Sequence, residues 1–372
     1  MRDLNKRIKR MYIPIILITY LFIFSGCRNG QNSFCSPIVK TVGKIDVMVD
    51  PNVEMMMILG RLGNIVPYSG EKSAYSHPYL DRVDEYFAPY KEDVAIKRAR
   101  VFWMTDYVLP EFGMYLKDDM SSFIMNPQDE NFITLNGPAK NFLFYNHDTF
   151  RELVKDFRIN SNFDKFFIEN ESVYDSMLNR VLPILEKINI SSWIEDFYGE
   201  EIKDKLRISL TQTSFCSYGL SVSTPEGNRI PHIILWLREI EEANDIVVLL
   251  SHEFSHPYTR KITDALCKNK EVYNIFNKLF QKYGETYNKC GYYNTENILN
   301  EIINQACSNK FLEKTLSKEY VDFYKKYEVD SLKQIYVPQI AKFLDNYQNN
   351  RDKYKTLEDF IPELEKFILT LE

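Results

Sequence analysis

The chain has 372 residues, of which 45% are hydrophobic and 14% aromatic, enough for one large globular domain or two joined lobes. Its formal net charge is −6, and basic residues are concentrated at the N-terminus. Without residues 1–26, Lys+Arg falls from 46 to 41 and Asp+Glu from 52 to 51, which leaves a net charge of −10. This acidic balance argues against nucleic acid as a partner, because a surface that binds nucleic acid is basic.

Residues 1–26 have the pattern of an export signal. Basic residues precede an apolar stretch, Met11 to Phe24, that is shorter than a typical membrane-spanning helix. Ser25 and Gly26 then precede Cys27. This arrangement resembles the lipobox of bacterial lipoproteins, which implies cleavage before Cys27 and lipidation of that residue. A plain secretory signal and an N-terminal anchor helix are the alternatives. All three place the remaining chain outside the cytoplasm, and the lipobox implies a lipid-anchored protein of the cell envelope.

Residues 27–42 are expected to form the lipidated cysteine and a polar tether, and residues 43–200 a mainly helical lobe. The pattern predicts a strand at 44–49 and a helix that begins after Asp50 and ends before Gly63. Further helices are predicted at 79–88, 92–108, 148–158 and 171–196.

Two histidines lie in this first lobe. His77 is in a turn and His147 just before a predicted helix. Structural roles, such as helix capping, are favoured for both, because lone histidines without ligand spacing rarely bind metal.

The second lobe, residues 201–372, opens with three strand-like runs at 206–213, 218–223 and 232–237. The last two flank turn residues and form a hairpin-like pair ahead of an apolar run. Amphipathic helices are predicted at 317–327, 330–346 and 356–371. Overall, the sequence predicts an α+β, mostly helical protein.

The stretch His-Glu-Phe-Ser-His at residues 252–256 matches the HExxH pattern. Positions i and i+4 share one face of a helix, so His252 and His256 place two imidazoles on one metal ion. Glu253 is then placed to act as general base on a metal-bound water. Zinc suits this site because it binds neutral imidazole and lowers the pKa of its water. The alternative is an ordinary helix end whose histidines form local hydrogen bonds.

Pro257 directly follows the motif. Proline has no N–H and disfavours the helical conformation in the residue before it. We therefore expect the helix to end or kink at His256.

A catalytic zinc site needs a third protein ligand and an open position. No histidine follows His256, so a downstream carboxylate is the natural choice. Residues 294–306 have helical spacing of apolar residues behind an Asn or Thr cap. This helix offers Glu296, which lies closer to the centre of the apolar face, and Glu301, which lies beyond the first turn.

The HExxH motif followed by Asn300-Glu301 on a later helix resembles the gluzincin family of zinc peptidases. The resemblance implies a zincin-like catalytic core that holds one zinc ion per chain. His252, His256 and Glu301 would be its ligands and Glu253 its general base. The chain also resembles uncharacterised bacterial lipoproteins with an HEFSH core. In zincins, a strand ahead of the HExxH helix borders the cleft and pairs with extended substrate, which here means 219–223 or 232–237. A hairpin that only packs the core is the alternative.

Other polar residues are candidates for supporting roles. Tyr292, Tyr293 and His232 are candidate oxyanion donors. The candidates for orienting the histidines are Asp245, Asn297, Asn300 and Asn304.

The function expected from the sequence is hydrolysis of peptide bonds in a peptide or protein substrate, by a membrane-anchored zinc enzyme. The alternatives are a non-catalytic binding or structural lipoprotein with a degenerate HExxH site, and a zinc hydrolase that acts on an amide in cell-wall or glycan material.

Overall fold

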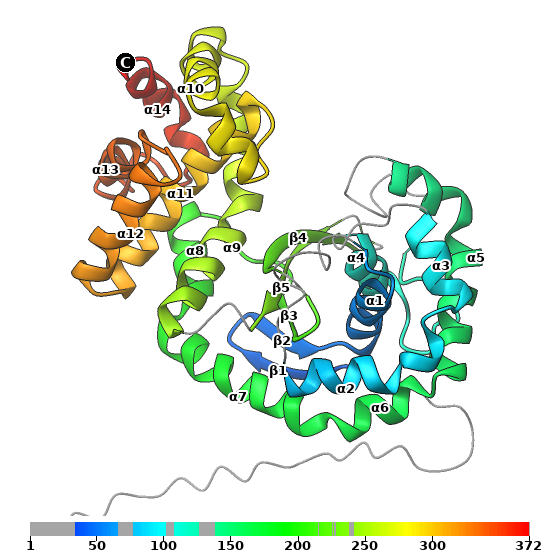
Figure 1. The fold of residues 1–372 in the computed structure, drawn as a ribbon. Coiled ribbons are helices and arrows are strands. Elements are labelled where there is room, and N and C mark those ends of the chain that lie inside the picture. The colour runs from blue at the N-terminus through cyan, green and yellow to red at the C-terminus, as the bar shows by residue number, and fades with distance from the viewer. Residues whose placement is uncertain are drawn as a thin grey trace, which may run out of the picture. The chain divides into compact units, whose positions relative to one another are not determined.

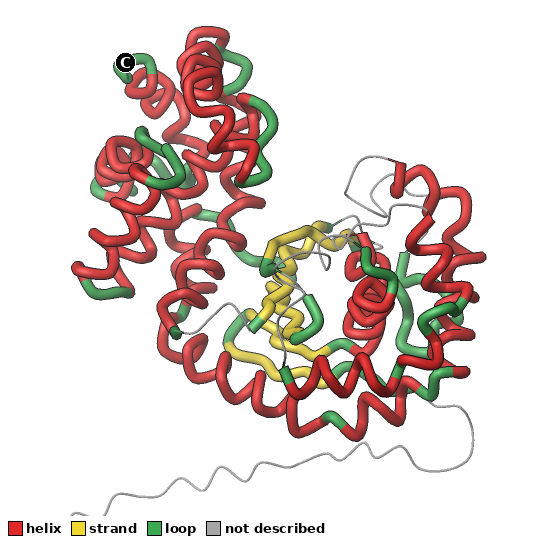
Figure 2. The backbone as a smooth tube through the Cα atoms, viewed as in Figure 1, coloured by secondary structure: helices red, strands yellow, loops and turns green. Residues whose placement is uncertain are grey.

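The computed structural model describes residues 34–65, 77–101, 108–125, 138–214, 216–224, 226, 228–237 and 242–371. The predicted signal peptide, Cys27 and the first part of the tether lie outside the described residues. Phe34–Glu372 form one compact unit, mostly helical with one small sheet (Figure 1, Figure 2). This confirms the α+β, mostly helical class. None of the described helices has the length and apolar character needed to cross a bilayer.

Helices dominate the first half of the chain. Their bounds are α1 Pro51–Leu62, α2 Pro78–Tyr86, the short 3₁₀ helix η2 Ala88–Tyr90, α3 Val94–Val101, α4 Val108–Tyr115, α5 Pro138–Asn160, α6 Phe163–Glu169, α7 Glu171–Ile188 and α8 Ile190–Tyr198.

The local signals at two of these helices acted as predicted. Asp50 caps α1, and Gly63 follows its last residue. The His77 side chain accepts a hydrogen bond from the Tyr79 N–H and caps α2. The position predicted for His147 was wrong: His147 lies inside α5, where its ring packs edge-on against Phe123. The helix predicted at 148–158 is longer than expected, because α5 runs from Pro138 to Asn160.

The five strands form one sheet in the order β1-β2-β3-β5-β4. Their bounds are β1 Ile38–Val42, β2 Ile45–Val49, β3 Leu206–Thr211, β4 Tyr218–Ser223 and β5 Arg229–Trp236. The pairs β2–β3 and β3–β5 are parallel, whereas β4 runs antiparallel to β5 and forms an edge of the sheet. The sheet therefore combines strands from both sides of residue 200, where the sequence predicted a boundary between two lobes. The boundary itself stays a prediction.

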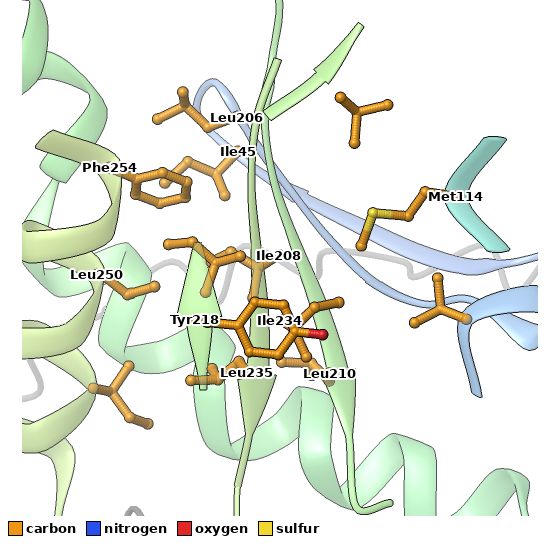
Figure 3. Close-up of a cluster of buried hydrophobic side chains, with 14 of the residues drawn as sticks. Ile45, Met114, Leu206, Ile208, Leu210, Tyr218, Ile234, Leu235, Leu250 and Phe254 are labelled. Atoms are coloured by element: carbon orange, nitrogen blue, oxygen red, sulfur yellow. The ribbon is translucent and has the colours of Figure 1, made fainter. Parts of the chain in front are cut away.

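The hairpin β4–β5 leads into α9, Ala243–Leu266, which carries the HExxH motif and packs against both strands. Leu250 and Phe254 of α9 point toward Ile208 and Leu235 from one face of the sheet, and Met114 of α4 lies on the other face (Figure 3). Residues that alternate along the strands thus contact helices on both faces of the sheet. This packing holds β4 beside the motif.

The predicted helix end at His256 was wrong, because α9 continues through Pro257 for two more turns, and a kink at this point stays a prediction. Pro257 has no N–H to give to the Glu253 carbonyl. Contacts beyond the proline hold the helix: the Thr259 hydroxyl donates to Asn304 Oδ1 at 2.9 Å, and Asn300 Nδ2 donates to the Thr263 hydroxyl at 3.2 Å. Tertiary packing therefore overrides the local preference.

Helices also make up the remaining chain. They are α10 Lys270–Lys289, α11 Thr295–Thr315, α12 Lys318–Asp330, α13 Val337–Gln348, the 3₁₀ helix η3 Glu358–Phe360 and α14 Ile361–Ile368. Asn294 caps α11, as the sequence predicted. The helix predicted from residue 330 instead begins at Val337, because Lys333 adopts a left-handed conformation with φ of 59° in the turn after α12. Of the described cysteines, Cys267, Cys290 and Cys307 are free thiols.

Replacing Pro257 with alanine should stabilise the protein. The change restores one backbone hydrogen bond donor inside α9, where proline costs about 3 kcal/mol relative to alanine. The added freedom of the unfolded chain takes back up to about 1 kcal/mol. We expect the free energy of unfolding in urea to rise by about 1–3 kcal/mol for Pro257→Ala. The exposed Asp264→Ala change on the same helix is the control and should stay within about 0.5 kcal/mol. A less stable Pro257→Ala protein would contradict this account of α9.

Candidate metal centre

Helices α9 and α11 pack directly against each other and bring three predicted ligands together. His252 and His256 lie one turn apart on α9, with their Nε2 atoms 3.1 Å from each other. Glu301 of α11 places Oε2 3.4 Å from His252 Nε2 and Oε1 3.5 Å from His256 Nε2. Among the described residues, these three form the only group of histidine, cysteine or carboxylate side chains with the spacing of a metal site.

The spacing of these three side chains fits zinc. A zinc ion bonds imidazole nitrogen at about 2.0–2.1 Å and carboxylate oxygen at about 2.0–2.2 Å in tetrahedral geometry, so neighbouring ligand atoms lie about 3.3–3.5 Å apart. The two Nε2 atoms lie 3.1 Å apart, and each lies 3.4–3.5 Å from a different oxygen of the Glu301 carboxylate, which is close to this spacing. The donor set of two nitrogens and one oxygen is also the chemistry that zinc accepts in catalytic sites.

Amide side chains of α11 orient both histidines. His252 Nδ1 lies 2.8 Å from Gln305 Oε1, and His256 Nδ1 lies 3.1 Å from Asn300 Oδ1. An amide oxygen only accepts, so His256 Nδ1 carries the proton, and so does His252 Nδ1 when it bonds Gln305 at 2.8 Å rather than Asn304 Nδ2 at 3.2 Å. In these tautomers each Nε2 presents its lone pair to the shared space. Two facing lone pairs beside a carboxylate favour a cation between them.

Asn304 ties the two helices together next to the site. Its Nδ2 donates to the His252 carbonyl at 3.0 Å, and its Oδ1 accepts from Thr259 at 2.9 Å. Of the four residues predicted to orient the histidines, Asn300 and Asn304 contact them. Asp245 instead accepts from Tyr320, and Asn297 from the Tyr293 N–H.

Gln305 makes the shortest of the hydrogen bonds to the histidines, but the sequence analysis missed it. Its position, next to Asn304 on the same helix and four residues after Glu301, was the available signal. It did not stand out because i and i+4 neighbours on a helix become informative only when the ligand on that helix is known.

Glu301 is nearly buried, and its environment holds it in place. The Tyr292 hydroxyl donates to Glu301 Oε2 at 3.1 Å. Burial raises the pKa of Glu301, against the opposing effects of His252 and of the Tyr292 hydrogen bond. Burial, with the neighbouring His252, lowers the pKa of His256 to about 4, so His256 is neutral at pH 7 as a zinc ligand must be.

The other candidates lie elsewhere. Glu296 is exposed and lines a shallow pocket with Asp264 and Cys267, apart from the two histidines. Tyr293 is 71% exposed. His232 is buried in the sheet, with Nε2 2.8 Å from the Ser209 hydroxyl, and burial lowers its pKa to about 3. Of the three candidate oxyanion donors, only Tyr292 reaches the ligand group.

Glu253 points from α9 to the edge strand. Its Oε2 accepts a hydrogen bond from the Gly219 N–H of β4 at 2.9 Å. A Cβ atom at residue 219 would lie 2.5 Å from this oxygen, so only glycine allows the strand to approach so closely. The carboxylate is therefore held beside the ligand group by a strand that lies far away in sequence.

A cleft of about 920 Å³ opens beside Glu253 and His256. One wall is formed by β4 with Arg229 and Pro231 of β5, and the other walls come mainly from α9 and from the loop between α8 and β3. The lining residues include Gly219, Leu220, Ser221, Tyr258, Arg260 and Glu200. Of the ligand group, His256 lines this cleft, next to Glu253.

Comparison with known proteins gives one family. The family model described as "Domain of unknown function (DUF4932)" matches residues 45–367. The searches of curated proteins and of solved structures found no match.

Zinc binding should depend on Glu301 and not on Glu296. We expect the wild-type chain to bind one zinc ion in competition with a chromophoric chelator. Glu301→Gln should weaken binding at least about 100-fold, because a neutral amide replaces an anionic ligand. Glu296→Gln makes the same chemical change five residues earlier on the same helix and should leave the affinity unchanged. Equal affinities for the wild type and Glu301→Gln would exclude the carboxylate as a ligand.

Proposed function

The chain belongs to the DUF4932 family, and we propose that it is a zinc metallopeptidase of the gluzincin type. One observation carries the proposal. His256 of the ligand group and Glu253 line one cleft, together with Gly219, Leu220 and Ser221 of the edge strand β4. A structural metal site is closed by a fourth protein ligand, whereas a catalytic one has three and an open position. Among the described residues the group has three members.

His252, His256 and Glu301 would hold the zinc ion. When bound there, zinc supplies a water of lowered pKa and polarises the carbonyl of the bond to be cut. The residues of the chain do the rest. Gln305 and Asn300 fix the histidine tautomers, and Tyr292 fixes the orientation of the Glu301 carboxylate.

Glu253 acts as the general base. It takes a proton from the attacking water and delivers it to the amine that leaves. Its hydrogen bond from Gly219 orients the carboxylate without adding a formal charge. The same hydrogen bond joins the base to the strand that would hold the substrate. The strand would therefore position both the substrate and the base.

The β4 edge supports a peptide as the substrate. The hydrogen bond from Thr224 N–H to the Asn228 carbonyl, at 2.8 Å, fixes which residues of the hairpin are hydrogen-bonded partners. Alternation then makes Ser221 and Pro231 a pair without mutual hydrogen bonds, as Pro231 requires because it has no N–H. Ser221 therefore directs its N–H and carbonyl away from β5, toward the cleft, where an extended peptide can add as a further strand.

We also propose that the enzyme is lipid-anchored to a membrane of the cell envelope through Cys27. The support is the basic, apolar and Ser25-Gly26-Cys27 pattern of the N-terminus. Two acyl chains on one residue, rather than one, would give stable anchoring.

Peptide hydrolysis should need Glu253 and its contact with β4. We expect the zinc-loaded wild type to cut members of a random peptide library. Glu253→Gln should keep its zinc and lose about 100-fold or more of kcat/KM, the range found for a positioned general base. Gly219→Ala should push the carboxylate aside and also lose up to about 100-fold, because small displacements of a catalytic group are costly.

Gly284→Ala is the matched control for the second variant, because a Cβ atom there meets nothing within 4 Å. It should leave kcat/KM unchanged. Zinc-loaded wild-type protein that cuts no peptide in the library would contradict the proposed function.

The anchor has its own test. In a bacterial host that processes lipoproteins, we expect the wild-type chain to take up labelled fatty acid and to sediment with membranes. Cys27→Ser should abolish labelling, because serine offers no thiol for the lipid. Cys290→Ser, a change at an exposed thiol in the folded unit, should leave labelling intact. Labelling that survives Cys27→Ser would rule out this residue as the site.

A further inference from the structure

We propose that Tyr115 sets the length of peptide that pairs with β4, which makes it a specificity-determining residue. This inference rests on the proposed peptidase function. The Ser223 N–H at the far end of β4 donates to the Tyr115 hydroxyl at 2.9 Å. A side chain from α4 thus occupies the position where the next hydrogen bond to a substrate would form.

Three β4 residues present their N–H groups away from β5. The register that pairs Thr224 with Asn228 also makes Gly219, Ser221 and Ser223 point outward. The Gly219 N–H donates to Glu253, and the Ser223 N–H donates to Tyr115. Within the described strand, this leaves the N–H of Ser221 for a substrate, together with the outward carbonyls of Gly219, Ser221 and Ser223.

Tyr115 is a fixed stop. Its side chain is fully buried, and burial raises the pKa of its hydroxyl. Its helix, α4, packs against both α1 and β4. On β4 the described lining of the cleft includes Gly219, Leu220 and Ser221, and neither Ser223 nor Tyr115, whereas Asn228 and Arg229 on the other arm of the hairpin do line it.

The direction of β4 determines on which side of the cut bond the length of the substrate is limited. The strand runs from Gly219, beside Glu253, toward Ser223. A peptide that adds antiparallel to this edge runs the opposite way, so residues on the N-terminal side of the cut bond lie toward Ser223. The residue opposite Ser221 makes two hydrogen bonds. The residue two places further toward the peptide N-terminus meets the N–H that Tyr115 already occupies. The favoured substrates are therefore peptides with a short stretch before the cut bond.

A peptide series tests this directly. All members share one cleavable sequence and gain one residue at a time at the N-terminus. For zinc-loaded wild type, kcat/KM should rise until the residue opposite Ser221 is present and then stay flat. For Tyr115→Phe, the residue opposite Ser223 should bring a further rise of about fivefold, the value of one hydrogen bond. Tyr347→Phe removes another buried hydroxyl, one that donates to the Phe197 carbonyl, and should keep the wild-type plateau.

A binding series separates this inference from the proposed function. Dissociation constants of the same peptides are measured by calorimetry on zinc-loaded Glu253→Gln, with and without Tyr115→Phe. The wild-type plateau and its extension in Tyr115→Phe should appear there too. If no peptide is cut, the peptidase function fails while the binding series still decides the inference. A plateau that is the same with and without Tyr115→Phe would overturn the inference. So would continued gain in the wild type, or no binding of any member.

Discussion

The close packing of α9 against α11 is the constraint on which the site depends. Buried polar groups are stable only when they are hydrogen-bonded, and here the two helices satisfy each other. Asn304 bridges them from the inside, and Asn300 and Gln305 receive the two histidine N–H groups. This packing of α9 against α11 leaves the two Nε2 lone pairs and the Glu301 carboxylate facing one point. The same contacts hold α9 in a helical conformation beyond Pro257.

The edge strand of the sheet, β4, lies beside this centre. Leu250 and Phe254 fix α9 on one face of the sheet (Figure 3), and the hairpin then brings β4 beside Glu253. Gly219 is the point of contact, because a larger residue would displace the carboxylate. The base, the proposed metal and the strand edge therefore meet in one cleft, and Tyr115 closes the far end of that edge.

Local patterns predicted much of this fold. The caps at Asp50 and Asn294, the hairpin, and the shared face of His252 and His256 follow from spacing within a few residues. The choice between Glu296 and Glu301 did not. The apolar face of the isolated helix pointed to Glu296, but α11 is buried on nearly all sides, so its apolar centre does not mark the side that meets α9.

The remaining site features depend on contacts between distant parts of the chain. Gly219 meets a residue 34 positions away, Gln305 one 53 positions away, and Ser223 one 108 positions away. No local pattern encodes such pairs. X-ray absorption at the zinc edge, on protein loaded with one zinc ion, tests the central claim most directly. The account predicts four nitrogen or oxygen neighbours at about 2.0–2.2 Å, two of them imidazole. A sulfur neighbour at about 2.3 Å, fewer than two imidazoles, or no zinc bound after reconstitution would contradict it.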